Sequence, residues 1–333
     1  MVSQLPSEFK LIAHHFAPLS LGFPGAYELR DDAAVISPSP GFELVVKTDA
    51  IVGGIDFLLD EPADFVARKA LRVNLSDLAA KGAIPRAYMV DLILPDTIGE
   101  AWIANFAAGL AQDQAEYEVY LIGGDMSATP GPVTVAVTAF GETPPGRIIR
   151  RGGAKAGDFI FVSGTVGDAA LGLAVQKGKL TDLEPDQASF LMDRYRLPRP
   201  RVRLGTRLIG MATAGLDGSD GLVADLHHLC DVSNLAATIE ARRVPLSSAA
   251  RVAFAAHPEL FSTILTGGDD YEIVFTASPK QKAAIAALSQ SSGVPITPTG
   301  VMTRSSEGAQ SAVSVIDDRN RPLVFASEGW THL

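Results

Sequence analysis

Aspartates recur at sequence positions where they could bind a metal ion. They flank apolar stretches or lie in glycine-rich turns, and they are Asp31, Asp32, Asp49, Asp125, Asp217, Asp220, Asp269 and Asp270. Carboxylate oxygens are the preferred ligands of hard divalent cations, and they favour magnesium above zinc. Taken singly, each aspartate is explained as well by a turn or a helix cap. As a set, they predict a site in which divalent cations hold an anionic substrate.

Asp77 differs from these aspartates because it lies on a predicted helix, from Pro62 to about Lys81. Apolar residues recur on one stripe of this helix at spacings of four and three, and the stripe continues onto Asp77. An ionised carboxylate on an apolar stripe is costly unless it is paired or bound to metal. The alternatives are a metal ion, an ion pair with Arg68, Arg72 or Lys81, and a stripe that reaches solvent before its end.

The sequence lacks the residues that several other kinds of functional site require. The single cysteine, Cys230, excludes an intramolecular disulfide and a thiolate zinc cluster, and we expect a buried structural thiol. The histidines include adjacent pairs, which diverge on a helix, and no His-Glu-x-x-His motif occurs. A calcium-binding EF-hand starting at Asp217 is excluded because its twelfth position is His228. Walker A, protein-kinase and Gly-x-Ser-x-Gly motifs are absent from the sequence.

The formal net charge of −10 argues against binding to a nucleic acid backbone. It also means that an anionic phosphate needs a positive intermediary, and a divalent metal ion is the simplest one. No apolar run approaches the roughly 20 residues that span a bilayer, and residues 1–10 carry no apolar signal core. We therefore expect a soluble, cytoplasmic protein.

Strand and helix patterns alternate through the 333 residues, which predicts an α+β (mixed α/β) fold of two domains. Residues 1–149 form the expected N-terminal domain and residues 150–333 the C-terminal domain, with a basic linker over 147–155. Strands are expected over residues 33–37, 43–48, 87–94, 119–122, 133–140, 159–163, 235–239 and 271–276. Helices are expected over residues 62–81, 99–117, 167–177, 187–194, 222–229 and 279–289.

Several segments resemble the thiamine-monophosphate kinase family of the aminoimidazole ribonucleotide synthetase-like superfamily. They are Asp31-Asp32-Ala33-Ala34-Val35, Thr48-Asp49, residues 73–83 with Asn74-Leu75-Ser76-Asp77-Leu78-Ala79, Gly123-Gly124-Asp125, residues 151–158, Ser219-Asp220-Gly221-Leu222 and residues 266–272 with Gly267-Gly268-Asp269-Asp270-Tyr271-Glu272. Their order and spacing agree with the family over nearly the whole chain. The resemblance implies a two-domain protomer whose N-terminal sheet joins that of a second copy in a homodimer, with ATP bound nearby.

The resemblance also implies roles for individual residues. The implied magnesium ligands are Asp32, Thr48, Asp49, Asp77, Asp125, Asp217 and Asp220. The implied ATP contacts are Gly124, Asp125, Arg151 and Ser219. The implied substrate contacts are Asp269 and Trp330, together with the position of Asp56.

The main departures of the chain from the family pattern are at Lys47 and Asp56. Lys47 stands where the family has a small hydroxyl residue, which implies one metal contact fewer. Asp56 stands where the family has a substrate-binding histidine, and an ionised carboxylate cannot donate a hydrogen bond to a phosphate. Smaller departures are Arg30, Gly218 and Asp269.

The activity that the resemblance implies is direct transfer of the ATP γ-phosphoryl group to thiamine phosphate, which gives thiamine diphosphate. Asp49, Asp77 and Asp125 would hold magnesium ions that bridge the phosphates. No catalytic general base is expected, because the acceptor oxygen is already anionic. The alternatives are another ATP-using enzyme of the superfamily and an inactive nucleotide-binding or scaffold relative. Lys47 and Asp56 favour the inactive relative.

Overall fold

The computed structural model describes residues 6–305, 312–325 and 329. The chain forms two compact units. The first comprises Met1–Leu78 and Ala83–Gly146, and the second comprises Ala79–Gly82 and Arg147–Leu333. The sequence predicts the division between residues 149 and 150.

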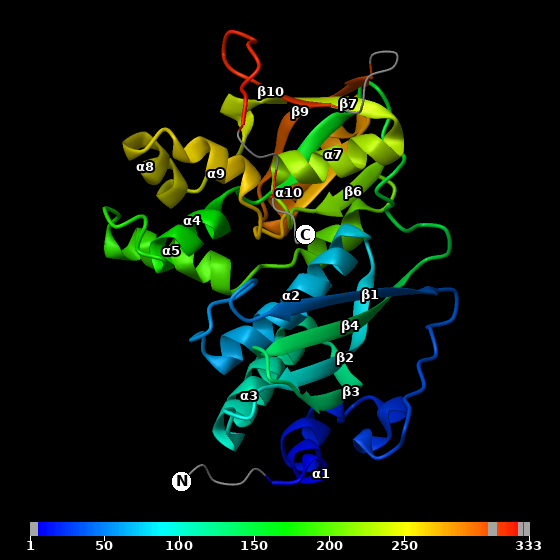
Figure 1. The fold of residues 1–333 in the computed structure, drawn as a ribbon. Helices are drawn as coiled ribbons and strands as arrows, with labels where there is room; N and C mark the ends of the chain where they lie inside the picture. The colour runs from blue at the N-terminus through cyan, green and yellow to red at the C-terminus, as the bar shows by residue number, and fades with distance from the viewer. Residues whose placement is uncertain (1–5, 306–311, 326–328, 330–333) are drawn as a thin grey trace. The chain divides into compact units, whose positions relative to one another are not determined.

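A four-stranded sheet with strand order β1-β4-β2-β3 forms the centre of the first unit. The strands are β1 (Glu43–Val52), β2 (Ile84–Leu94), β3 (Tyr120–Ala128) and β4 (Thr134–Thr143). β4 runs antiparallel to both β1 and β2, whereas β2 and β3 are parallel. Two long helices, α2 (Ala63–Ala80) and α3 (Glu100–Tyr117), lie on one side of this sheet (Figure 1).

The predicted apolar stripe of α2 is confirmed, since Val66, Ala70 and Val73 are all buried. α2 is also joined to α3 by a buried ion pair. The Arg72 guanidinium donates from Nε to Asp113 Oδ2 at 2.7 Å and from Nη2 to Asp113 Oδ1 at 2.8 Å. A planar guanidinium that binds both oxygens of one carboxylate fixes its geometry closely. This pair therefore holds the two helices in register beneath the sheet.

The N-terminal segment packs on the other face of the sheet, over β2 and β3. It contains four short helices, α1 (Glu8–Leu11), η1 (Ile12–Phe16), η2 (Ala17–Ser20) and η3 (Pro24–Leu29). Ala26 is buried there with Ala87 and Ile122. The strand expected over residues 33–37 is wrong, because this segment is irregular and packs Ala34 and Ile36 against that cluster. Apolar alternation there reflects packing on top of a sheet rather than pairing within one.

A six-stranded sheet with order β10-β7-β9-β5-β8-β6 forms the centre of the second unit. The strands are β5 (Phe159–Ser163), β6 (Ala214–Asp217), β7 (Leu235–Glu240), β8 (Ile273–Ala277), β9 (Ile296–Arg304) and β10 (Val313–Ile316). β10 and β7 are parallel, and the other neighbours are antiparallel.

Alternate residues of this sheet enter two separate cores, as the two-residue period of a strand requires. Ile160 and Val162 pack in the larger core, whereas Phe161 packs in the smaller one, where its ring stacks on that of Phe275 at 5.2 Å. The helices of this unit are α4 (Asp168–Gln176), α5 (Pro185–Arg196), α6 (Val202–Gly205), α7 (Leu222–Ser233), α8 (Ser248–Ala256), α9 (Leu260–Thr266) and α10 (Lys282–Ser292).

The basic segment over residues 147–155 is not the free linker that its composition predicted. Ile149 is buried in the smaller core of the second unit. Its N–H donates to Lys81 O at 3.0 Å, and Arg150 O accepts from Gly215 N at 2.9 Å. The segment is therefore fixed to the second unit, with the Arg150 and Arg151 side chains exposed. Among the described residues, no helix has both the length and the apolar character needed to span a membrane.

Candidate functional site

Three predicted site residues meet on the edge strand β1 and the facing helix α2. Lys47 and Asp49 are two residues apart on β1, so their side chains point to the same face of the sheet. Their register partners on β4 are Ala139 and Val137, which are both buried. Lys47 Nζ lies 3.1 Å from Asp49 Oδ2 and 2.8 Å from Oδ2 of Asp77 on α2.

In this arrangement Asp77 forms an ion pair, which is one of the alternatives that its position on the apolar stripe left open. Its carboxylate is paired with a lysine from β1, and not with any of the cations on its own helix that the sequence suggested. Burial by itself would lower the pKa of the Lys47 ammonium, but the carboxylates of Asp77 and Asp49 outweigh that effect and raise the pKa above its ordinary value. The two predicted metal ligands Asp49 and Asp77 therefore already share one fixed positive charge.

Thr48 points to the opposite face of β1. Its hydroxyl donates to Val137 O at 3.2 Å and accepts from Thr138 Oγ1 at 3.1 Å. Thr48 is therefore separated by the sheet from its neighbours Lys47 and Asp49. Its predicted role as a metal ligand stays a prediction.

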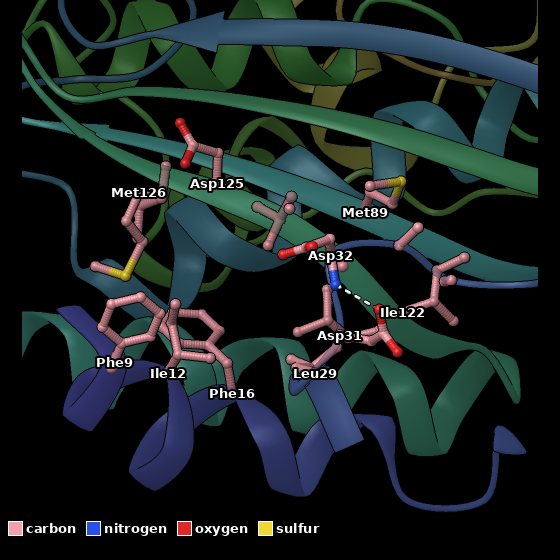
Figure 2. A pocket seen from close by; sticks show the side chains of 17 residues that line it. Phe9, Ile12, Phe16, Leu29, Asp31, Asp32, Met89, Ile122, Asp125 and Met126 are labelled. Carbon is pink, nitrogen blue, oxygen red and sulfur yellow. Dashed lines mark hydrogen bonds between the residues drawn. The ribbon is translucent and has the colours of Figure 1, made fainter. Parts of the chain in front are cut away.

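A second group of predicted residues lines a cavity of about 260 Å³ between the N-terminal segment and strands β2 and β3. Asp31, Asp32, Gly124 and Asp125 are among its lining residues. Figure 2 shows the carboxylates of Asp32 and Asp125 at this cavity, with the apolar side chains of α1 and η1 beneath them. The cavity thus combines an apolar wall with an acidic rim, and the carboxylates of the rim could hold a divalent cation.

Local bonds hold the acidic rim in place. The N–H of Asp32 donates to Asp31 Oδ1 at 2.8 Å, and Ser127 Oγ donates to Asp125 Oδ2 at 2.7 Å. Gly124 has a φ of 146°, and a Cβ atom there would lie 1.8 Å from Val90 O. Only glycine fits at this position, because a Cβ atom would clash with the backbone of the neighbouring strand β2. Asp125 lies within β3 rather than after a strand, which is a difference from the sequence-based expectation.

Asp56 has a local structural role in the turn after β1. Its Oδ2 accepts from Val52 N at 2.7 Å, and its carbonyl accepts from Lys69 Nζ at 2.9 Å. These bonds fix the turn in the way that aspartate commonly does. The predicted substrate contact at this position stays a prediction.

In the second unit, two loops carry the remaining described candidates. Asp217 ends β6, and Ser219 and Asp220 follow it before α7 begins. The other loop, residues 267–272, leads into β8, and Asp269 N donates to Ser219 O at 2.7 Å. Ser219 Oγ donates to Asp220 Oδ1 at 3.1 Å. The predicted ATP contact Ser219 and the predicted substrate contact Asp269 are therefore directly hydrogen-bonded neighbours.

Asp225 was not among the predicted site residues. It is buried in the first turn of α7, and its Oδ2 accepts from Asp220 N at 3.3 Å. Burial raises the pKa of its carboxyl well above the ordinary value, and the charges of Asp220 and Asp217 raise it further. The positive charge of the exposed Arg151 acts in the opposite direction and lowers the pKa of this carboxyl. The signal in the sequence was an acidic residue in the first turn of a helix, which is too common to be specific.

A buried ionic network supports the loop that carries Asp269. Glu272 is 1% exposed and accepts from Arg194 Nη2 at 2.9 Å, from Arg201 Nε at 2.7 Å and from Ser163 Oγ at 2.7 Å. It follows a loop in which Gly268, Asp269 and Tyr271 have φ values of 72°, 68° and 53°. Such backbone is strained for non-glycine residues and persists only where its surroundings hold it.

Asp270 anchors the same loop to α4. Its two oxygens accept from Gly167 N at 2.6 Å and from Ala169 N at 3.1 Å, at the start of that helix. Burial raises the pKa of its carboxyl to about 8, and the charge of Asp168 adds to the effect. Trp330, the other predicted substrate contact, lies outside the described residues.

Within the first unit, Asp32 and Asp125 line the cavity, and Asp49 and Asp77 flank Lys47. Within the second unit, Asp217 ends β6 and Asp220 precedes α7. Across the part of the chain that the structure describes, no three His, Cys, Asp or Glu side chains are arranged to hold a metal ion. Magnesium is commonly held by one or two carboxylates and completes its shell with water and substrate phosphates. Asp32 and Asp125 at the cavity, and Asp217 and Asp220 in the second unit, are carboxylates of the type that magnesium prefers, whereas Asp49 and Asp77 have Lys47 between them.

Comparisons with known proteins agree with this architecture. Residues 30–143 match the family profile of the AIR synthase related protein, N-terminal domain, and residues 155–310 match that of its C-terminal domain. The chain belongs to the AIR synthase related proteins, with one of their two domains matched in each unit.

Similar sequences identify the family to which the chain belongs within this class. A thiamine-monophosphate kinase from Caulobacter vibrioides is 39% identical over 330 residues, which cover 98% of this chain and 91% of the relative. One from Escherichia coli K12 is 39% identical and covers 98% of both chains. Within the AIR synthase related proteins, the chain is a member of the thiamine-monophosphate kinase family, as its resemblance to that family predicted.

Solved structures of this family have a similar fold. The crystal structure of the kinase from Stenotrophomonas maltophilia K279a superposes with a TM-score of 0.78 at 38% identity, covering 87% of this chain and 90% of that one. A structure of AaThiL complexed with AMPPCP and TMP gives a TM-score of 0.77 at 28% identity, covering 91% of each chain.

Proposed function

We propose that this protein transfers the γ-phosphoryl group of ATP to thiamine phosphate and releases thiamine diphosphate and ADP. One observation carries the proposal: Asp32 and Asp125 line one cavity together with the exposed Gly124. A structural relative binds AMPPCP and TMP, which are the analogue of one substrate and the other substrate itself. The cytoplasmic location suggested by the sequence stays a prediction.

Phosphoryl transfer requires alignment and charge neutralisation rather than a protein nucleophile. Bound magnesium ions would neutralise the phosphate oxygens and hold them in line. In this proposal Asp32 and Asp125 bind metal at the cavity, and Asp217 and Asp220 do so in the second unit. Arg151 and Ser219 contact ATP, and Asp269 contacts the thiamine portion together with Trp330. No general base is needed, because the acceptor phosphate oxygen is anionic at neutral pH.

Product analysis tests the activity. Purified protein with magnesium and ATP should form ADP and thiamine diphosphate in equal amounts when thiamine phosphate is supplied. Thiamine and aminoimidazole precursors serve as competing acceptors. Nucleotide binding without ADP formation would instead select the inactive relative that Lys47 and Asp56 favour, and turnover of an aminoimidazole precursor would select another enzyme of the class.

A matched pair of variants tests the cavity. Asp125→Asn should lower kcat by at least about 100-fold, because it removes a charged ligand and leaves the shape unchanged. Asp91→Asn is the control. Asp91 is the register partner of Asp125 on β2, is likewise exposed, and does not line the cavity. Equal activity of the two variants would contradict the assigned role of Asp125.

We further propose that the first unit pairs with a second copy through the face of its sheet that carries Thr48. Leu44 and Val46 lie on that face of β1 and are 37% and 57% exposed. Glu142 on β4 is the register partner of Leu44 on one side and of Ile84 on the other. Ile84 is 43% exposed. Exposed apolar side chains of this size on one face of a sheet are typical of an interface.

The oligomeric state tests the pairing. Val46→Asp should convert a dimer to a monomer in light scattering coupled to gel filtration. The control is Val252→Asp on α8, where the valine is 44% exposed in the second unit. A monomeric wild type, or a Val46→Asp dimer, would contradict the proposed interface.

A further inference from the structure

We propose that the ammonium group of Lys47 takes the place of a divalent cation between Asp49 and Asp77. This chain would then bind one metal ion fewer at that position than the same chain with a small hydroxyl residue at position 47. The inference rests on the proposed function only in that it adds Asp49 and Asp77 to the phosphate-binding site of that function.

The geometry gives Lys47 the central position. Its Nζ contacts one oxygen of each carboxylate, at 3.1 Å from Asp49 Oδ2 and 2.8 Å from Asp77 Oδ2. Because Asp49 comes from β1 and Asp77 from α2, Lys47 links the edge of the sheet to the helix beneath it. Bridging carboxylates from separate elements is also what a structural cation does.

An ion and the ammonium group cannot both occupy this position. Magnesium binds oxygen at 2.0–2.1 Å, so an ion that contacted both Oδ2 atoms would lie in the space that Nζ fills. Two cations confined there would also repel each other. Lysine is charged at neutral pH, so its charge is present at any magnesium concentration.

The replacement changes what the position can do. The ammonium group offers three N–H donors and one positive charge, whereas magnesium offers two charges and further ligand positions. Two of the donors point to Asp49 and Asp77. The third remains for a phosphate oxygen, and the Lys47 side chain is 31% exposed, which leaves it within reach of a ligand. Lys47 thus offers a hydrogen bond where a metal ion would offer a coordination bond.

Counting bound ions tests the inference without measuring turnover. Mn²⁺ binds oxygen ligands as magnesium does and is detected by electron paramagnetic resonance. The full chain, saturated with AMPPCP, is titrated with Mn²⁺ as wild type, as Lys47→Ser, as Lys47→Arg, and as Lys177→Ser, which removes a lysine just after α4.

The expected result is one additional Mn²⁺ per chain in Lys47→Ser alone. Mn²⁺ should also raise the Tm of Lys47→Ser more than that of wild type, because the ion replaces the missing positive charge between the carboxylates. An equal count in wild type and in a folded Lys47→Ser variant, verified by circular dichroism, would overturn the proposal.

A second variant tests whether Asp49 binds the ammonium group of Lys47 or a metal ion. Asp49→Asn in the wild-type background should leave the Mn²⁺ count unchanged, because Asp49 binds the ammonium group rather than a metal. Loss of an ion in this variant would overturn the proposal. Neither result depends on the proposed activity, since the product assay on wild type decides that separately.

Discussion

The backbone N–H of Asp269 donates to the carbonyl of Ser219 at 2.7 Å, so two loops predicted to contact different substrates are joined. Tyr271 N reinforces the junction by donating to Gly218 O at 2.8 Å. Because the bonds run between backbone atoms, a shift of one loop must move the other. A change in either loop should therefore affect the KM values for ATP and for thiamine phosphate together.

Gly268→Ala tests this junction. Gly268 has a φ of 72°, and a Cβ atom there would lie 2.3 Å from Ser219 O. The left-handed backbone costs an alanine about 1 kcal/mol, and displacing the Ser219 backbone should add about 1–3 kcal/mol. We expect the free energy of unfolding to fall by about 2–4 kcal/mol in urea titrations, and both KM values to rise.

Gly178→Ala is the control for that variant. Gly178 has a similar φ of 66°, and nothing lies within 4 Å of an added Cβ. It should lose only the backbone contribution of about 1 kcal/mol and keep both KM values. Equal effects at the two glycines would show that contact with Ser219 is unimportant.

Glu272→Gln should destabilise the second unit strongly. The substitution leaves Arg194 and Arg201 beside a neutral amide, and breaking a buried ion pair from one side costs about 3–5 kcal/mol. The comparison is Glu240→Gln, whose partners Arg242 and Arg243 are exposed at the surface. That pair should contribute no more than about 1 kcal/mol. Urea unfolding of both variants measures the difference, and comparable losses would contradict the importance of burial.

Asp270 should make stability depend on pH. Burial raises the pKa of its carboxyl to about 8 in the folded chain, against 3.8 as its ordinary value. Between these values the folded state binds a proton that the unfolded state has lost, so the contribution of Asp270 to stability falls as pH rises.

Asp270→Asn does not titrate at this position. The free energy of unfolding of wild type minus that of Asp270→Asn should therefore decrease from pH 5 to pH 8, by up to about 1.4 kcal/mol per pH unit. Urea titrations at four pH values measure it. A difference that increased with pH would mean that the hydrogen bonds from Gly167 and Ala169 keep the carboxylate ionised.

Cys230 should be unreactive in the folded protein. It is 0% exposed, as the sequence predicted for a structural thiol, and burial raises its pKa to about 12. At pH 8 the shift in pKa alone lowers the thiolate fraction by about three orders of magnitude. Ellman's reagent should label one thiol per chain in guanidinium and almost none in the native state. Rapid native labelling would show that α7 opens readily.

Periodic signals predicted the backbone well where an element has one apolar face. The helix expected from Pro62 to about Lys81 is α2, because a stripe repeating every three to four residues depends only on local geometry. β6, β9 and β10 were missed. β6 is four residues long and buried throughout, so it shows no alternation that could identify it.

The sequence predicted the residue types of the candidate site better than it predicted which of those side chains lie together. The pattern placed Asp77 on the apolar stripe of α2 and required a partner, but Lys47 lies on a strand 30 residues earlier and no local pattern links the two. The expected convergence of carboxylates came from chemistry alone. Which of them share a face depends on strand register and loop packing, which are tertiary properties.

The alternation along β1 constrains how this segment can change. The side chains of Lys47 and Asp49 lie on the face of the sheet that packs against α2, whereas the side chain of Thr48 between them lies on the opposite face. Inserting or deleting one residue before Lys47 would invert every later side chain of the strand, and would aim an ammonium group and a carboxylate at the wrong surface. Descendants of this sequence can therefore vary the segment by substitution, but they are bound to keep its length.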